Sequence, residues 1–167
     1  MNPICVVTVD ELSQKNIIVW EKAISEGIES YSIYKLAGSQ YIQIGNVLYD
    51  EMSEFIDYGS SPMVHADRYK ISVIDTCGAE SELSPYQQTI NLGVSQGVPE
   101  STMVLDWNYF VDESGTFIPD YYYIYRGIDP YTMELIDSVS GVFNTYNDVD
   151  IYSQFHYAVG VRKPSDC

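Results

Sequence analysis

The chain has 167 residues and a formal net charge of −16 at pH 7, with 46% hydrophobic and 14% aromatic residues. This hydrophobic content is enough for one medium core or two small ones and excludes a disordered chain. A chain this acidic repels phosphate backbones, so we do not expect nucleic-acid binding. No apolar stretch reaches about 18 residues, so we do not expect membrane insertion.

The residue types favour strands over helices. Tyrosine occurs 16 times, Val, Ile and Thr are frequent, and no long stretch of Ala, Leu, Glu and Lys is present. Such residues suit pleated, half-buried surfaces. The expected fold class is therefore all-β.

The first half of the chain alternates apolar and polar residues in short runs, separated by turn segments rich in Gly, Ser and Asp. Short strands at this spacing are typical of a β-sandwich or barrel. The predicted strands, in chain order, are residues 4–9, 16–21, 30–36, 41–49, 54–58, 68–75 and 87–92.

The second half repeats these blocks in the same order, at a spacing of roughly 90 residues, the size of one domain. "NIIVW" ends at Trp20 and "TMVLDW" at Trp107, "YSIYK" matches "YYIYR", "FID" matches "YND", and "YKISV" matches "YAVGV". After a short linker at 91–101, the predicted strands are residues 102–109, 120–126, 133–139, 144–148 and 154–162. No final strand is evident before the last residue, Cys167.

In order and spacing, these blocks resemble tandem fibronectin type III modules. The resemblance implies two consecutive immunoglobulin-like β-sandwiches, residues 1–92 and 93–167, the second without an evident last strand. It also implies a core built on a Trp of the second strand, a Tyr of the third and a Y-x-hydrophobic-x-hydrophobic sixth strand. The matching residues are Trp20, Tyr34, Tyr69, Ile71 and Val73 in the first half and Trp107, Tyr125, Tyr157, Val159 and Val161 in the second.

The segment "RYKISVIDTCGAESELSPYQQTINL" is also similar to modules of large secreted or cell-surface proteins of Bacteroidetes-type bacteria. The resemblance implies an exported parent protein with further domains, although "MNPICVVTVD" lacks the features of a signal sequence. We expect a fragment whose continuation supplies the missing strand. Two alternatives remain open: the strand edge is covered in another way, or another chain donates a strand.

Three cysteines fit neither a paired set nor a metal site, since no CxxC occurs. In a seven-stranded sandwich, Cys5 in the first strand and Cys77 after the sixth would lie at the same pole, which makes a disulfide conceivable. The alternative is two separate thiols. Cys167 matches Cys77 in the second copy, so we expect its partner beyond this chain.

No catalytic residues, metal ligands or cofactor are predicted. His65 and His156 are the only histidines, and no nucleophile elbow accompanies either. Lys163 and Arg162 are the only basic side chains near a cysteine that could lower the pKa of its thiol, which gives little support to a reactive thiol. The acidic segments lack the calcium-loop pattern and fit the exterior of an acidic chain, so we predict a protein that is not an enzyme.

The run "PDYYYIYRG" would place Tyr121, Tyr123 and Tyr125 on one face of a strand and Tyr122 on the other. One face must be core, and the other would present rings of the kind found in binding hot spots and sugar sites. Tyr121, Tyr122 and Tyr123 are therefore candidate binding residues, with ordinary strand packing as the alternative. The expected function is a spacer, adhesion or protein-binding module; the alternative is an accessory carbohydrate-binding region of a polysaccharide-degrading enzyme, with an unidentified protein or glycan partner.

Overall fold

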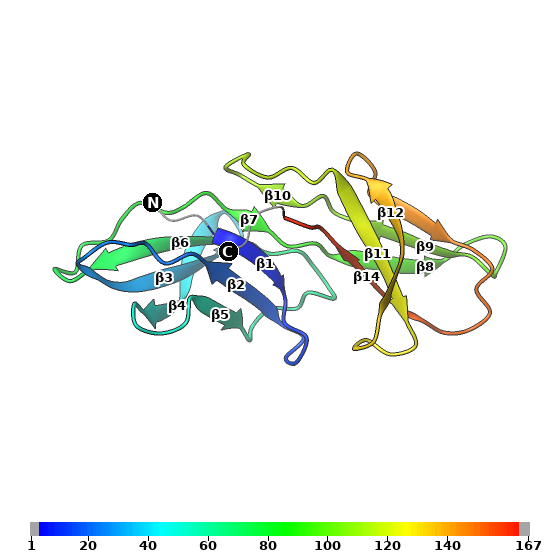
Figure 1. The fold of residues 1–167 in the computed structure, drawn as a ribbon, viewed down its shortest axis with the longest axis horizontal. Helices are drawn as coiled ribbons and strands as arrows, with labels where there is room; N and C mark the ends of the chain where they lie inside the picture. The colour runs from blue at the N-terminus through cyan, green and yellow to red at the C-terminus, as the bar shows by residue number, and fades with distance from the viewer. Residues whose placement is uncertain (1–3, 164–167) are drawn as a thin grey trace. The chain divides into compact units, whose positions relative to one another are not determined.

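The computed structural model describes residues 4–163, and its regular elements in that range are strands, β1 to β14. The prediction of an all-β fold is confirmed. Within the same range, no helix long and apolar enough to cross a membrane is found. The chain forms two compact units (Figure 1): residues 4–89 with Val111–Thr116, and Ile90–Phe110 with residues 117–163.

The first unit consists of two antiparallel sheets whose strands match the predicted ones closely in position. The smaller sheet has the order β1-β2-β5, formed by Ile4–Val9, Asn16–Trp20 and Glu54–Asp57. The larger sheet has the order β10-β7-β6-β3-β4. Its strands are β3 (Ile28–Ala37), β4 (Gln40–Leu48), β6 (Arg68–Asp75), β7 (Gln87–Gln88) and β10 (Val111–Asp112).

The core of the first unit forms where inward residues of both sheets meet. Trp20 of β2 packs against Tyr31 of β3, with ring centroids 5.4 Å apart, and Ile33 and Tyr69 are fully buried beside them. Tyr31 therefore holds the core position that the sequence assigned to Tyr34. That assignment was wrong because Tyr34 stands an odd number of residues from Tyr31, so it lies on the opposite face of β3.

The last predicted strand of the first unit is regular only over Gln87–Gln88. The polar segment before it, residues 81–84, also forms hydrogen bonds with β6. Ser81 and Ser84 donate their N–H groups to the carbonyls of Val73 and Ile71, at 2.9 and 2.8 Å. Their hydroxyl oxygens accept the N–H groups of the same two residues, both at 3.0 Å. Along this edge, serine hydroxyls thus take the acceptor role that the backbone carbonyls of a neighbouring strand would have.

β10 has no counterpart among the predicted strands. It extends the larger sheet of the first unit by pairing Val111 with Gln88. Glu113 fixes the segment, because its carboxylate lies 2.9 Å from Lys70 Nζ and accepts the N–H of Tyr86 at 3.0 Å. The bond from Lys70 lowers the pKa of Glu113.

The second unit has the strand order β8-β9-β13 in one sheet and β12-β11-β14 in the other. The predicted linker is partly wrong, because Leu92–Gln96 is β8, a strand of this unit. In the described part of the unit, no strand pairs with the outer edge of β14. The remaining strands are β9 (Met103–Trp107), β11 (Tyr121–Gly127), β12 (Glu134–Ser140), β13 (Thr145–Asp148) and β14 (His156–Gly160).

The two units repeat one plan. β8, β9, β11, β12, β13 and β14 occupy the places that β1 to β6 hold in the first unit. Trp107 packs against Tyr122 with ring centroids 5.4 Å apart, the separation found between Trp20 and Tyr31. Tyr125, assigned to the second core, lies like Tyr34 on the outer face of its strand, for the same reason of parity.

Candidate functional site

The tyrosines of β11 divide between the two faces of the strand. Tyr122 is 1% exposed and its hydroxyl accepts the N–H of Phe110 at 2.9 Å, so its predicted binding role is wrong. Tyr121 is 51% exposed, and Tyr123 and Tyr125 are half-buried on the outer face. Tyr121, Tyr123 and Tyr125 form a line along β11, which we call the tyrosine row.

Small side chains flank most of the tyrosine row. Directly opposed residues of neighbouring strands lie on the same face of a sheet. The row is thus bordered by serine hydroxyl groups on the β12 side, where Leu135 opposite Tyr125 is larger, and by small directly opposed residues on the β14 side. The small neighbours are Ser140 and Ser138 on β12 and Gly160 and Ala158 on β14.

Arg162, two residues beyond β14, contacts two members of the tyrosine row. Its guanidinium carbon lies 4.2 Å from the ring centroid of Tyr123, a cation–π contact. A hydrogen bond with Tyr125 raises the pKa of Arg162. The guanidinium therefore restrains both rings and is itself engaged by them.

The first unit carries different residues at the same positions. Ser30 and Ser32 flank Tyr31 as Tyr121 and Tyr123 flank Tyr122, and both serines are buried. The amide of Asn46 donates to the Ser30 hydroxyl at 2.9 Å, and Gln43 donates to Ser32 at 3.1 Å. Since one plan accommodates serine or tyrosine here, the fold itself does not require the exposed tyrosines of the second unit.

A charged cluster joins the two sheets of the first unit. Lys35 Nζ lies 2.9 Å from Asp57 Oδ2 and 3.0 Å from Asp67 Oδ2, and the Tyr69 hydroxyl donates to Asp57 at 2.7 Å. Burial works to lower the pKa of Lys35, but the bonds to the two carboxylates outweigh it and raise the pKa. Burial also raises the pKa of Tyr69.

The second unit repeats this cluster with one carboxylate fewer. Arg126 Nη1 lies 2.8 Å from Asp148 Oδ2, and the Tyr157 hydroxyl donates to the same oxygen at 2.9 Å. Burial, followed by the bond to Asp148, raises the pKa of Tyr157 to about 12. Because the cation, carboxylate and phenol recur on equivalent strands and bind one another, we assign both clusters to sheet-to-sheet stabilisation.

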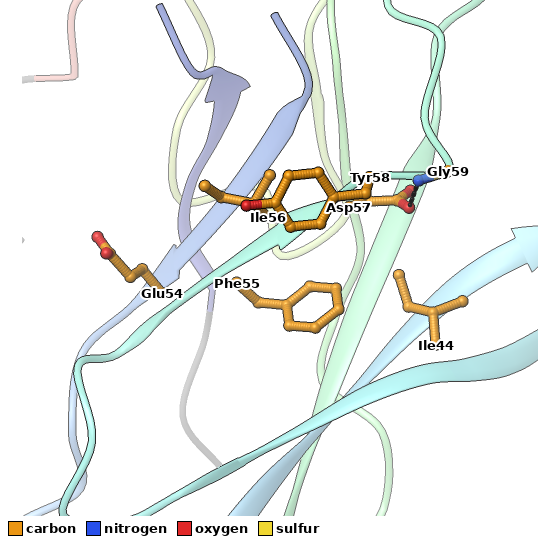
Figure 2. A pocket seen from close by; sticks show the side chains of 7 residues that line it. All are labelled: Ile44, Glu54, Phe55, Ile56, Asp57, Tyr58 and Gly59. Atoms are coloured by element: carbon orange, nitrogen blue, oxygen red, sulfur yellow. Dashed lines mark hydrogen bonds between the residues drawn. The ribbon is translucent and has the colours of Figure 1, made fainter. Parts of the chain in front are cut away.

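A groove of about 490 Å³ lies along β5, with Phe55 of β5 and Ile44 of β4 reaching into it (Figure 2). Asp57 accepts the N–H of Gly59 at 3.0 Å with one oxygen and bonds to Lys35 and Tyr69 with the other. The residues lining the groove contain no histidine, cysteine, serine or lysine, and of the two carboxylates among them, that of Asp57 is held by the internal bonds just described. They are Ile44, Glu54, Phe55, Ile56, Asp57, Tyr58 and Gly59.

The conceivable Cys5–Cys77 disulfide is absent. Cys77 is a free, exposed cysteine whose N–H donates to Asp75, whereas Cys5 is disulfide-bonded elsewhere. The Cys5 carbonyl accepts a bond from Gln87, which is paired with Tyr69 at the start of β6. Cys77 follows the other end of β6, and six residues of strand span about 20 Å, well beyond the reach of a disulfide.

The two histidines noted in the sequence lie at exposed positions. His65 is 54% exposed at the side chain, with Nε2 3.3 Å from Asp67 Oδ1, and His156 is exposed on β14. Across residues 4–163, no three His, Cys, Asp or Glu side chains gather in a way that could hold a metal ion. Cys167 and the expectation of its partner lie outside the described residues.

No family model matches this chain, and no curated protein matches it either. Among solved structures, it is similar to the chicken CNTN1 FN1–FN3 domains, with a TM-score of 0.41 and 12% identity over 94% of this chain and 60% of that one. This chain therefore spans about 60% of the length of that structure. It is also similar to a two-domain fibronectin type III segment of chicken tenascin, with a TM-score of 0.33 and 15% identity over 95% of this chain and 89% of that one.

The strand order of the two units defines the class of fold. In each unit, the first, second and fifth strands face a sheet built on the third, fourth and sixth. Each unit has a Trp of its second strand packed on a Tyr of its third. The protein is thus a pair of immunoglobulin-like β-sandwiches of the fibronectin type III kind.

Proposed function

We propose that this chain is a non-enzymatic interaction module of a larger exported protein of Bacteroidetes type, and that the tyrosine row is its binding surface. The observation that carries the proposal is the difference between the units: tyrosines 121 and 123 face outward where the first unit has hydrogen-bonded serines. Exposed aromatic residues that the fold does not need are typical of binding surfaces.

The first unit serves in this proposal as a spacer that carries the second. Its outer face is occupied by internal hydrogen bonds, among them those from Asn46 and Gln43. The partner is a protein or a glycan outside the chain. A carbohydrate-binding role beside a catalytic domain is the second candidate, favoured by the serine hydroxyls along the tyrosine row.

Retention on an immobilised protein tests the proposal. The wild-type chain and a Tyr121→Ser/Tyr123→Ser variant are coupled to a matrix, and extracellular protein and polysaccharide fractions from a Bacteroidetes culture are passed over each. A Tyr131→Ser/Tyr152→Ser variant is the control, since those side chains are 65% and 84% exposed outside the strands. Retention by wild type and control alone supports the proposal; equal retention by all three, or none by wild type, contradicts it.

A further inference from the structure

We propose that the tyrosine row binds an uncharged glycan chain that lies along β11. This inference rests on the proposed function and names its ligand.

The tyrosine row is only one strand wide. A stable protein partner needs roughly 800 Å² on each side and about 20 residues. The residues directly opposite the row are two serines, one alanine, one glycine and one leucine, and Ser and Ala are depleted at protein interfaces. A line of rings one strand wide, with small residues directly opposite Tyr121 and Tyr123, fits a slender ligand better than a broad protein surface.

Two rings of the tyrosine row lie in line along β11, so a slender ligand that follows the strand can contact both. Tyr121 and Tyr123 stand two residues apart, which places their side chains about 7 Å apart along the strand. The C–H face of a pyranose packs against an aromatic ring, while its hydroxyls need polar partners at the rim. The exposed hydroxyls of Ser138 and Ser140, opposite the same two tyrosines, stand where such partners are needed.

The charge of the protein selects an uncharged ligand. At −16 the chain repels acidic polysaccharides. The cation nearest the tyrosine row, Arg162, already stacks on Tyr123 and bonds to Tyr125. Neither feature favours a carboxylate- or sulfate-bearing glycan over an uncharged one.

Affinity electrophoresis tests this inference. The wild-type chain, Tyr121→Ser/Tyr123→Ser and the Tyr131→Ser/Tyr152→Ser control are run in native gels that contain xyloglucan, glucomannan, laminarin or polygalacturonate. We expect at least one of the three neutral polysaccharides to retard wild type and control, and the Tyr121/Tyr123 variant to bind it roughly tenfold more weakly or worse. Circular dichroism melting of each variant shows whether its fold is retained.

The outcomes separate this inference from the proposed function. Retardation of wild type by polygalacturonate alone, by none of the neutral polysaccharides, or equally in the Tyr121/Tyr123 variant overturns the glycan inference. In those cases the proposed function still stands if the same double substitution abolishes retention of a secreted protein. If that retention is also unchanged, both proposals fail.

Discussion

Lys35 is the cation that separates two buried carboxylates. Asp57 and Asp67 have 9% and 5% exposed side chains, and both lie within 3.0 Å of the same ammonium group. Removing one partner of a buried charge cluster leaves the others uncompensated. The equivalent cluster of the second unit has a single carboxylate, so the first unit depends more on its cation.

Substituting Lys35 with Met is expected to lower the free energy of unfolding of the first unit by about 3–5 kcal/mol, because two carboxylates then face each other without a cation. Urea unfolding followed by Trp fluorescence measures the loss. Lys22→Met, which removes a cation held only near the Tyr49 ring, is the control and should cost less than about 1 kcal/mol. Equal effects of the two substitutions would contradict this account of the cluster.

Tyr157 should make the second unit sensitive to alkali. Its folded pKa is raised from 10.0 to about 12, so the protonated phenol is favoured by folding. The resulting stability is fully present below pH 10 and is lost as the pH rises toward about 12. We expect the stability difference between wild type and Tyr157→Phe to shrink over this window; denaturant titrations at pH 8 to 12 measure it, and a constant difference would refute the assignment.

At the scale of elements, one edge of β6 is paired with a segment, residues 80–88, that is a regular strand over only two residues. Residues 80–88 supply backbone groups and serine hydroxyls in alternation. Pro85 lies in the middle of this segment and has no N–H to donate. The serines compensate for a sequence unable to form a regular ladder.

Two serines of this segment form a matched pair for measurement. Ser84 is completely buried, so Ser84→Ala should leave the Ile71 N–H without an acceptor and cost about 1–3 kcal/mol. Ser81 makes the same bond to Val73 in an exposed position, where water replaces it, so Ser81→Ala should cost well under about 1 kcal/mol. Amide hydrogen exchange of Ile71 in the Ser84 variant and of Val73 in the Ser81 variant, beside urea unfolding of both, reports the difference, and similar losses of stability would contradict the role given to the buried hydroxyl.

Alternation along the chain predicted most strands, but the faces of β3 and β11 only in part. The family resemblance assigned Tyr34 and Tyr125 to the cores, whereas the structure buries Tyr31 and Tyr122. β10 was missed because two residues carry no periodicity, and its pairing depends on a distant strand. Arg162 was missed for the same reason: its contact with Tyr123 spans two strands and has no local signal.

At the scale of the molecule, each unit has its own core. The first is centred on Trp20, Tyr31 and Tyr69, and the second on Trp107, Tyr122 and Leu105. The repeat of the two tryptophans was readable from the sequence because each ends a β-rich block. The exchange of serine for tyrosine on either side of Tyr31 and Tyr122 became evident only when the equivalent strands β3 and β11 were compared in the structure.

Each tryptophan should support its own unit. Trp107→Ala and Trp20→Ala are both expected to cost about 3–5 kcal/mol, since a large buried side chain is removed. Hydrogen exchange should show lost protection of Leu105 and Ile124 in the first variant, and of Ile33 and Ile71 in the second. Uniform loss over the whole chain from either substitution would contradict the existence of two separate cores.

Because of β10, the boundary between the two units does not coincide with one point in the sequence. The stretch Val111–Thr116 follows β9 of the second unit in the chain. It nevertheless belongs to the first unit and completes the larger sheet of that unit. A protein cut after Thr89 would therefore lose the partner of β7 and the carboxylate that holds Lys70 and Tyr86. Separating the two repeats at their sequence boundary would break this sheet, so the first half is expected to be less stable alone than within the whole chain.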